Sequence, residues 1–275
     1  MFSTPILLVV FNRPDTTKEV FETIRKIKPK SLYVAADGPR PHMPEDNQHC
    51  EQVRAIFKNI DWDCDLKTHY RTDNLGCKNG MIDSINWFFS NVEEGIILED
   101  DCVPNDSFYP FCTTLLDRYR NNKKVMHIGG DNFQGGKTFG DGSYYFSAYA
   151  HIWGWATWRD RWKFYQPNFE TFDSFKKEKK ILQYIRHPRE RREWMSAIRR
   201  SIRKKTNSWS FQWTFTVWNE GGLAIIPNKN LVTNIGFRSD ATHTTTSDSL
   251  WENHPTEELG EIVHPSNKST YRRIR

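Results

Sequence analysis

Short apolar segments alternate with amphipathic segments through the first half of the chain. The first apolar segment, residues 6–11, is short and rich in branched side chains, which is typical of a buried strand. Further strands are expected at 32–36, 66–70, 95–98 and 125–128, and helices after Pro14 and at 52–57, 81–89 and 108–119. This alternation predicts βαβ units, and therefore an α/β fold with a mostly parallel sheet.

The second half of the chain has a different character. It is aromatic-rich over residues 144–165, strongly basic over 186–205 and rich in loop-forming residues after that. A chain of 275 residues fits one large α/β domain or two small ones. We expect a single domain overall, built from a first half at 1–130 and a second half at 131–275.

Composition narrows the class of protein. The five cysteines are odd in number and show no CxxC spacing, so neither a disulfide framework nor a zinc site is indicated, and a reducing cytoplasm fits best. No apolar run is long enough to cross a bilayer. Tryptophan is abundant, at 11 residues. Its flat faces suit sugar rings and interfaces, although a tryptophan-rich core explains the number equally well.

Polar side chains follow the predicted strands at the points where the strands end. In a parallel sheet, ligands bind outside the carboxyl ends of the strands, so these residues should meet in one crevice. They are Asn12, Arg13, Asp37, Arg71, Glu99, Asp100 and Asp101.

The acidic triplet Glu99-Asp100-Asp101 follows a predicted buried strand directly. Adjacent carboxylates repel one another unless a cation lies among them, and oxygen ligands select hard ions such as Mg²⁺ or Mn²⁺. Such an ion could bridge two phosphates and neutralise a leaving diphosphate. The alternative is a solvated acidic turn, which the preceding buried strand disfavours.

Three more residues have the chemistry of a nucleotide site. Asp37 could accept a hydrogen bond from a base or a ribose, or it could form an Asx turn. Arg13 could bind phosphate bidentately, or it could be a solvated surface arginine. Lys78 lies near the start of a predicted helix, where both its charge and the helix dipole attract phosphate, although a solvated lysine is as good an interpretation.

In ordered pieces over most of its length, the chain resembles the GT-A glycosyltransferases, and most of all the N-acetylglucosaminyltransferase I family and its bacterial glycan-biosynthesis relatives. The resembling pieces are Arg13, Asp37, the DXD-like Ile97-Leu98-Glu99-Asp100-Asp101, Asp131-Asn132, Gly154-Trp155 within His151-Ile152-Trp153-Gly154-Trp155, and His243.

The resemblance implies a Rossmann-like GT-A fold, with a nucleotide-sugar-binding half at 1–130 and a helical, aromatic-rich acceptor half at 131–275. It implies a sugar donor, with UDP as the favoured nucleotide, and a glycan or glycolipid acceptor of a bacterial surface polysaccharide such as lipopolysaccharide or capsule. Asp101 and His243 would ligate Mn²⁺ or Mg²⁺. The implied donor-binding residues are Asn12, Arg13, Asp37, Arg71, Lys78, Glu99, Asp100, Gly154 and Trp155, with Trp153 and Trp155 shaping the sugar pocket.

The position of the family's catalytic base departs from its pattern. The matching stretch here contains Gln212, and glutamine is not a useful proton acceptor near neutral pH. Asp131, Asp160 and Glu220 are the acidic candidates for the base. Inversion and retention of the anomeric configuration both stay open at this point.

The segment 186–205 contains nine Lys or Arg against two Glu, and an apolar stripe at helical spacing formed by Trp194, Met195, Ile198 and Ile202. This pattern predicts a basic amphipathic helix, which would contact an anionic membrane or a polyanionic acceptor. A solvated helix that covers the core is the alternative. No nucleic-acid-binding motif accompanies the basic residues. A cytoplasmic enzyme is therefore expected, with peripheral contact at the inner face of the membrane as a further expectation.

Two other functions compete with glycosyl transfer. A sugar nucleotidyltransferase should carry a glycine-rich phosphate loop after its first strand, and residues 11–14 contain no glycine. A non-catalytic membrane- or polyanion-binding protein would use the basic helix, but it gives no reason for three carboxylates at the end of a buried strand.

Overall fold

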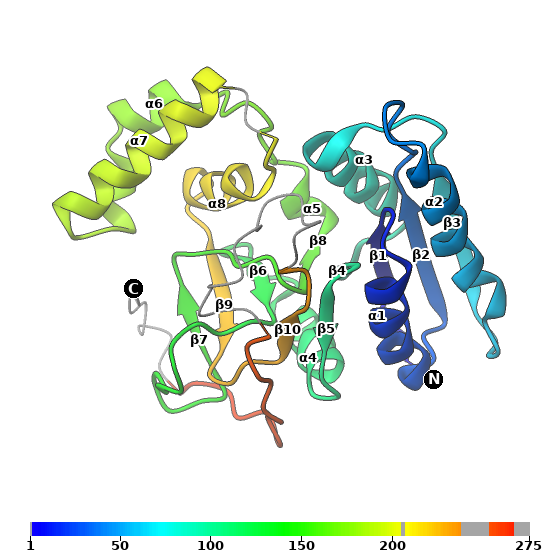
Figure 1. Cartoon of the computed structure of the whole chain (residues 1–275). Helices are drawn as coiled ribbons and strands as arrows, with labels where there is room; N and C mark the ends of the chain where they lie inside the picture. The colour runs from blue at the N-terminus through cyan, green and yellow to red at the C-terminus, as the bar shows by residue number, and fades with distance from the viewer. Residues whose placement is uncertain (1, 205–206, 238–252, 267–275) are drawn as a thin grey trace.

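One eight-stranded sheet forms the centre of the computed structural model, which describes residues 2–204, 207–237 and 253–266 (Figure 1). Its strand order is β3-β2-β1-β4-β8-β6-β9-β7. β8 runs antiparallel between β4 and β6, β7 runs antiparallel to β9, and the other pairs are parallel. The predicted α/β fold with a mostly parallel sheet is therefore confirmed. The strands are β1 (Ile6–Val10), β2 (Ser31–Ala36), β3 (Asp65–Tyr70), β4 (Glu94–Glu99), β6 (Val125–Gly129), β7 (Tyr144–Ser147), β8 (Trp155–Trp158) and β9 (Leu223–Pro227).

Helices cover both faces of this sheet. α1, α2 and α4 pack on one face, while α3, α5 and α8 pack on the other. β5 (Cys102–Pro104) and β10 (Val232–Asn234) form a separate antiparallel pair. The helices are α1 (Pro14–Ile27), α2 (Glu45–Ile56), α3 (Gly76–Asn91), α4 (Phe108–Tyr119), α5 (Arg159–Trp162), α6 (Phe172–Lys177), α7 (Pro188–Lys204) and α8 (Ser210–Asn219), with 3-10 turns η1 (Phe57–Asn59) and η2 (Lys180–Gln183).

The central strand β1 shows why its sequence is apolar throughout. Ile6, Leu8 and Val10 point to the face covered by α1, and Leu7 points to the face covered by α3. Since side chains alternate across a strand, a strand buried on both faces must be apolar at every position. This continuous run is the signal that made the first strand predictable.

The strands and helices predicted for the first half are all present, but α2 begins at Glu45, seven residues before the predicted start, α3 begins at Gly76 instead of residue 81, and β5 was not predicted. The second half contributes three strands to the same sheet that the sequence analysis did not predict: β7, β8 and β9. β8 lies between β4 and β6, so the stretches 1–130 and 131–275 share one continuous sheet. Its sequence, Trp-Ala-Thr-Trp, is too short to stand out from the aromatic segment around it.

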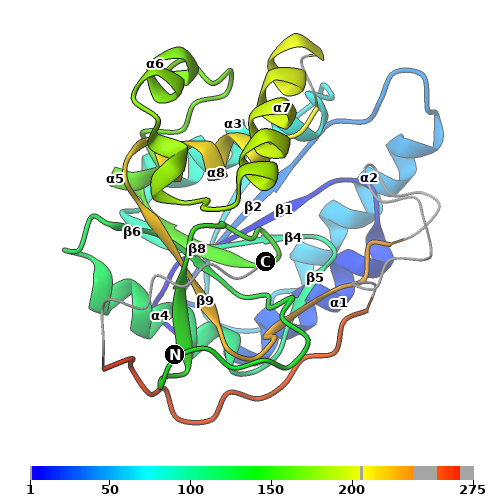
Figure 2. The same ribbon diagram turned by 90° about the vertical axis from the view of Figure 1, so that its left-hand side faces the viewer.

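The basic segment forms α7, which lies with α6 beyond α8, away from α1 and α4 (Figures 1 and 2). Its apolar stripe faces inward: Ile198 is fully buried, and Trp194 and Met195 pack on a cluster that contains Phe215 and Trp218 of α8. Only Ile202 of that stripe is exposed, at 39%. The packing agrees with a helix that covers the core, so the stripe itself is not free to enter a membrane. Among the described residues, no helix is long and apolar enough to span a bilayer.

Candidate active site

The ends of β1 and β4 are brought together by parallel pairing. Val9 of β1 lies beside Glu99 of β4, and the Phe11 backbone N–H donates to Asp100 at 3.3 Å. Arg13, at the start of α1, then reaches back over this edge. Its guanidinium forms an ion pair with Asp100 and another with Asp101, the latter at 2.9 Å. The strand-end residues of two segments far apart in the chain therefore meet, as the sequence predicted for this part of the edge.

Burial dominates the electrostatics of this carboxylate cluster. It raises the pKa of Glu99 to about 8, with further contributions from the charges of Asp101 and Asp100. Burial also raises the pKa of Asp100, although Arg13 opposes that shift. For Arg13, burial alone would lower the pKa, but the two aspartates raise it above its ordinary value. Arg13 is thus held as a permanent positive charge among the acids.

The same carboxylates have the chemistry of a site for a hard cation. Their oxygen atoms suit Mg²⁺ or Mn²⁺. Within the described ranges, however, no group of three or more potential ligands is arranged to hold an ion, and Arg13 supplies the compensating charge. The second predicted ligand, His243, lies outside the described residues. The segment that leads toward it passes close by, because the Ile235 N–H donates to the Asp101 carbonyl at 2.9 Å and a Cβ at Gly236 would lie 2.1 Å from Asp101 Oδ2.

Asp37, at the end of β2, caps the start of α3. Its carboxylate accepts hydrogen bonds from the backbone N–H groups of Leu75 at 3.0 Å and Gly76 at 3.1 Å. These N–H groups have no partner within the helix, so the carboxylate caps them and also meets the positive end of the helix dipole. Burial nevertheless raises the pKa of Asp37. The structure therefore gives this residue a capping role, and contact with a nucleotide base stays a prediction.

Three other residues that were predicted to bind the nucleotide sugar form contacts with other parts of the protein. Asn12 donates to the buried Asp46 at 2.7 Å, which joins the end of β1 to α2. Arg71, whose side chain is only 8% exposed, binds Asp83 of α3. Lys78 does not stand free at the helix start, because its ammonium donates to the Pro167 carbonyl at 2.7 Å.

The sequence analysis did not identify Arg54 of α2 as a residue at this edge of the sheet. Its guanidinium donates to the carbonyls of Asp37 at 3.2 Å and Arg71 at 2.7 Å, so it joins the ends of β2 and β3. Its place on a predicted helix gave no sign that it reaches two strand ends.

The Gly154-Trp155 motif divides into two roles. Gly154 has φ +65, and a Cβ there would lie 2.9 Å from Val232, so this turn into β8 requires glycine. Trp155 has no exposed surface; it stacks on His127 at 5.1 Å and on Trp209 at 5.6 Å. The expectation that Trp155 shapes a sugar pocket is therefore wrong, because pairing in β8 turns its side chain into the core.

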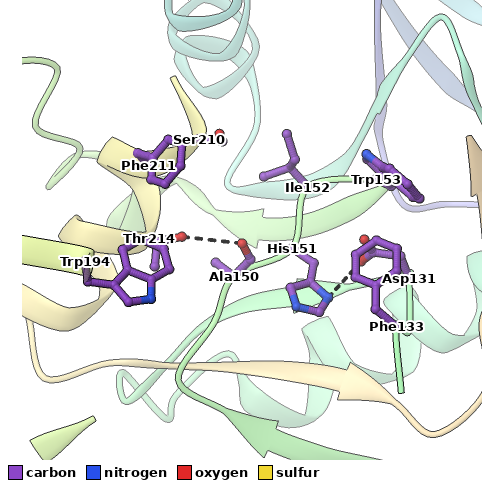
Figure 3. Close-up of a pocket in the computed structure, with 10 residues that line it drawn as sticks. All are labelled: Asp131, Phe133, Ala150, His151, Ile152, Trp153, Trp194, Ser210, Phe211 and Thr214. Atoms are coloured by element: carbon purple, nitrogen blue, oxygen red, sulfur yellow. Dashed lines mark hydrogen bonds and ion pairs between the residues drawn. The ribbon is translucent and has the colours of Figure 1, made fainter. Parts of the chain in front are cut away.

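Trp153, two residues earlier, does line a pocket of about 380 Å³ on the same edge of the sheet (Figure 3). Its ring contacts Phe237, next to the Gly236 that touches Asp101, so it lies between the carboxylate cluster and the pocket. The lining residues come from the turn after β6, the segment before β8, α7 and α8: Asp131, Phe133, Ala150, His151, Ile152, Trp153, Trp194, Ser210, Phe211 and Thr214. Phe133, Trp194 and Phe211 were not predicted as site residues, since each looked like an ordinary core or surface aromatic.

Asp131 is the acid in this pocket. Its residue is 1% exposed, and neither carboxylate oxygen accepts a hydrogen bond from the described part of the chain. His151 Nδ1 lies 3.5 Å from Asp131 Oδ1. Burial lowers the pKa of His151, but the charge of Asp131 outweighs burial and leaves that pKa raised. A buried carboxylate that lines a pocket and accepts no hydrogen bond from the described residues has the chemistry to take a proton or bind a hydroxyl group of a ligand.

The other two acidic candidates lie elsewhere. Asp160 follows β8 at Trp158, which pairs with Glu94 at the amino end of β4, and it forms ion pairs with Lys123 and Arg161. Glu220 is exposed, just before the Leu223 N–H that donates to the Lys124 carbonyl at the amino end of β6. Both therefore lie at the edge of the sheet opposite the carboxylate cluster. Neither can act there as the catalytic base.

Gln212, at the position where the resembled family has its base, is buried on α8 and does not line the pocket. Its side-chain oxygen has no hydrogen-bond partner among the described residues.

Comparison with known proteins identifies no family: no family model and no curated protein matches the chain. Membership of the N-acetylglucosaminyltransferase I family is accordingly not supported. Solved structures with some likeness include HddC from Yersinia pseudotuberculosis, at 7% identity over 57% of this chain and 78% of that one, with a TM-score of 0.35.

Two further solved structures have a similarly low likeness to this chain. A putative glucose-1-phosphate thymidylyltransferase from Bacillus anthracis, in complex with a sucrose, is 11% identical over 59% of this chain and 74% of that one, with a TM-score of 0.35. A UDP-glucose pyrophosphorylase complexed with UDP-glucose is 7% identical over 58% and 78%, with a TM-score of 0.34. Scores and identities this low carry no argument about activity.

Proposed function

We propose that the chain is a glycosyltransferase that takes a sugar from a nucleotide-diphosphate sugar, with UDP as the nucleotide, and passes it to a hydroxyl group of a glycan or glycolipid. The observation that carries this proposal is that the Arg13–Asp100–Asp101 cluster and the aromatic pocket that contains Asp131 lie at one edge of the sheet and are linked through Trp153 and Phe237. Transfer to a hydroxyl group needs a place for the leaving diphosphate and a base beside the acceptor, and these two parts supply them.

The donor side would hold the diphosphate. Asp101 and His243 would hold Mn²⁺ or Mg²⁺, which when bound would neutralise charge that develops on the leaving diphosphate. Arg13 is already fixed at this point as a positive charge and would bind phosphate oxygen atoms. The acids around it would set its position.

The acceptor side would supply the base. Asp131 takes the proton from the acceptor hydroxyl as that oxygen forms its bond to the sugar, and His151, 3.5 Å away, stabilises the carboxylate. A base at the attacking hydroxyl is the arrangement of a single displacement, so we propose that the anomeric configuration is inverted. Asp131 takes the role for which Gln212 is chemically unsuited.

Sugar nucleotidyl transfer is the second candidate; two of the solved structures named above are enzymes of that class, at a similarity too low to argue for it. Against it stands the connection from β1 to α1, residues 11–13, which has no glycine and carries Arg13 on two carboxylates. That reaction also needs no base such as Asp131, because the attacking phosphate oxygen of the sugar phosphate is already ionised.

One experiment separates the two. Nucleotide sugars are screened by thermal shift with and without Mn²⁺, since a ligand that binds the native state raises the melting temperature. Products are then analysed in two reactions: one holds the donor that binds together with a glycoside acceptor, and the other holds the matching nucleoside triphosphate and sugar phosphate. Glycosyl transfer releases a nucleoside diphosphate from the nucleotide sugar, whereas nucleotidyl transfer consumes a nucleoside triphosphate and a sugar phosphate and releases pyrophosphate. Pyrophosphate release would overturn the proposal.

Asp101→Ala tests the donor side. We expect loss of transfer and of the Mn²⁺-dependent part of the thermal shift, because the variant removes the predicted metal ligand and a partner of Arg13. Asp117→Ala, at an exposed surface ion pair on α4, is the control and should behave as the parent protein. Full activity of the Asp101 variant in the presence of EDTA would rule out the metal role.

A further inference from the structure

The pocket beside Asp131 has two aromatic walls. Trp194 and Phe211 lie on one side, and Phe133 and Trp153 lie on the other, with residues 150–152 between them (Figure 3). Within each wall the rings contact one another: the centroids are 5.6 Å apart in the first pair and 4.8 Å in the second. The space between the walls is therefore bounded by apolar ring surfaces.

These walls are held in place by the surrounding structure. Trp194 stacks on Tyr149 at 5.9 Å and contacts Trp218 at 4.8 Å, while Trp153 contacts Phe237 at 5.5 Å. Tyr149 also donates a hydrogen bond to Glu190, which ties α7 to the segment before β8. A ligand that enters finds its binding surface already formed, so little ordering of side chains opposes binding.

The polar groups of the pocket favour a ligand with several hydroxyl groups. Both oxygens of Asp131 are buried without a hydrogen bond in the described structure, and leaving a buried acceptor unsatisfied costs about 1–3 kcal/mol. Ligand hydroxyls would satisfy them. Ser210 and Thr214 add further hydroxyl groups on the opposite side, from α8.

The charged side chains in the pocket lining further restrict the class of ligand that it can bind. Among the described residues that line the pocket there is no Lys or Arg, and the cationic candidate among them, His151, already faces Asp131 at 3.5 Å. A carboxylate or phosphate group placed here would lie beside the charge of Asp131 without a lysine or arginine to compensate it. The exposed arginines of α7 do not change this, because the side chain that α7 directs into the pocket is Trp194.

We propose that the pocket selects an uncharged sugar ring as the acceptor, with its C–H faces against the two aromatic walls and its hydroxyl groups on Asp131. The inference rests on the proposed function and names its acceptor class. It places an anionic acceptor group, such as a lipid diphosphate or a uronate, outside this pocket.

The test uses saturation-transfer NMR on the full chain with matched probes. Methyl β-D-glucoside and methyl β-D-glucuronide differ only at C6, and methyl galactoside, mannoside and N-acetylglucosaminide complete the neutral set. We expect ring-proton signals from at least one neutral glycoside and none from the glucuronide. Absence of binding by every neutral glycoside, or equal binding of the glucuronide, would overturn the inference.

Two variants locate the binding. Phe211→Ala should weaken binding of the neutral glycoside by roughly two- to tenfold, as expected for loss of one aromatic contact. Phe164→Ala is its matched control, because Phe164 is 43% exposed against 42% for Phe211 but lies outside the pocket. Asp131→Asn should let the glucuronide bind, because it removes the repelling charge. An unchanged signal in the Phe211 variant would contradict the assignment.

The thermal shift with nucleotide sugars is measured on the same preparations. A donor that binds while every glycoside fails overturns the acceptor inference alone. Glycosides that bind while every donor fails overturn the proposed function and keep the pocket as a sugar site.

Discussion

Three acidic side chains of the second half differ in what surrounds them. Asp160 is neutralised by Lys123 and Arg161, and Glu220 is solvated. Asp131 is buried, and the turn that carries it is closely packed, since a Cβ on Gly130 would lie 2.5 Å from the Phe108 ring. The residue type is shared, so its surroundings decide which carboxylate can act on a ligand.

Asp131→Asn keeps the shape of the side chain and removes its ability to take a proton. We expect kcat to fall by about 10²–10⁴-fold, the usual contribution of a general base, while KM for the donor changes little. Initial rates with the identified donor and acceptor measure both. Asp160→Asn, at the opposite edge of the sheet, should leave kcat unchanged. If the Asp160 variant loses activity and the Asp131 variant does not, Asp160 is the base.

His151 makes the stability of the protein depend on pH. Its pKa is raised in the folded state by Asp131 in spite of burial, so the ion pair contributes fully below the ordinary pKa of histidine and is lost as pH rises through the raised value. We expect His151→Gln to lower the melting temperature more at about pH 5.5 than at about pH 9. An equal decrease at both values would show that the pair contributes no pH-dependent stability.

At the scale of elements, the start of α3 is capped by a residue of another element. Its own first residues offer no side-chain cap, and Asp37 of β2 supplies the acceptor from a distance in sequence. The helix and the strand are therefore joined by hydrogen bonds as well as by the packing of Tyr33 on Phe88 at 5.1 Å. This explains why a residue expected to meet a nucleotide also matters for folding.

Asp37→Ala should lower the free energy of unfolding by about 0.5–2 kcal/mol, the usual cost of losing a helix cap. Asp37→Asn keeps one acceptor oxygen and should lose less. Urea unfolding followed by circular dichroism measures both variants. If alanine proves as stable as aspartate, the capping role is wrong, and a nucleotide-binding role gains weight.

At the scale of the whole molecule, the order of the strands binds the two halves of the chain together. β6 belongs to the first half by sequence, but its neighbours in the sheet are β8 and β9, which belong to the second. β4 likewise pairs with β8 on one side. A cut near residue 130 would leave β6 unpaired and one edge of β4 open.

A fragment of residues 1–130 should therefore fail to fold cooperatively. Open strand edges recruit other chains, so we expect aggregation and no sharp thermal transition by circular dichroism, in contrast to the full chain. A soluble fragment with a cooperative transition would show that the first half is a domain of its own.

The sequence by itself determined the first half of the fold and part of the site. Buried strands need continuous apolar runs and helices need periodic ones, so β1 to β4 and their helices could be predicted locally. The meeting of Arg13 with Asp100 and Asp101 followed, because parallel strands place their carboxyl ends at one edge.

Only the tertiary structure decided which acid faces a pocket, which tryptophan is core and how α7 is turned. Asp131, Asp160 and Glu220 look alike in one dimension, and Trp153 and Trp155 are two residues apart in one motif. Their difference arises because β8 enters the sheet between β4 and β6, which buries Trp155 and leaves Trp153 beside the pocket. Long-range pairing of this kind leaves no periodic signal in a four-residue strand.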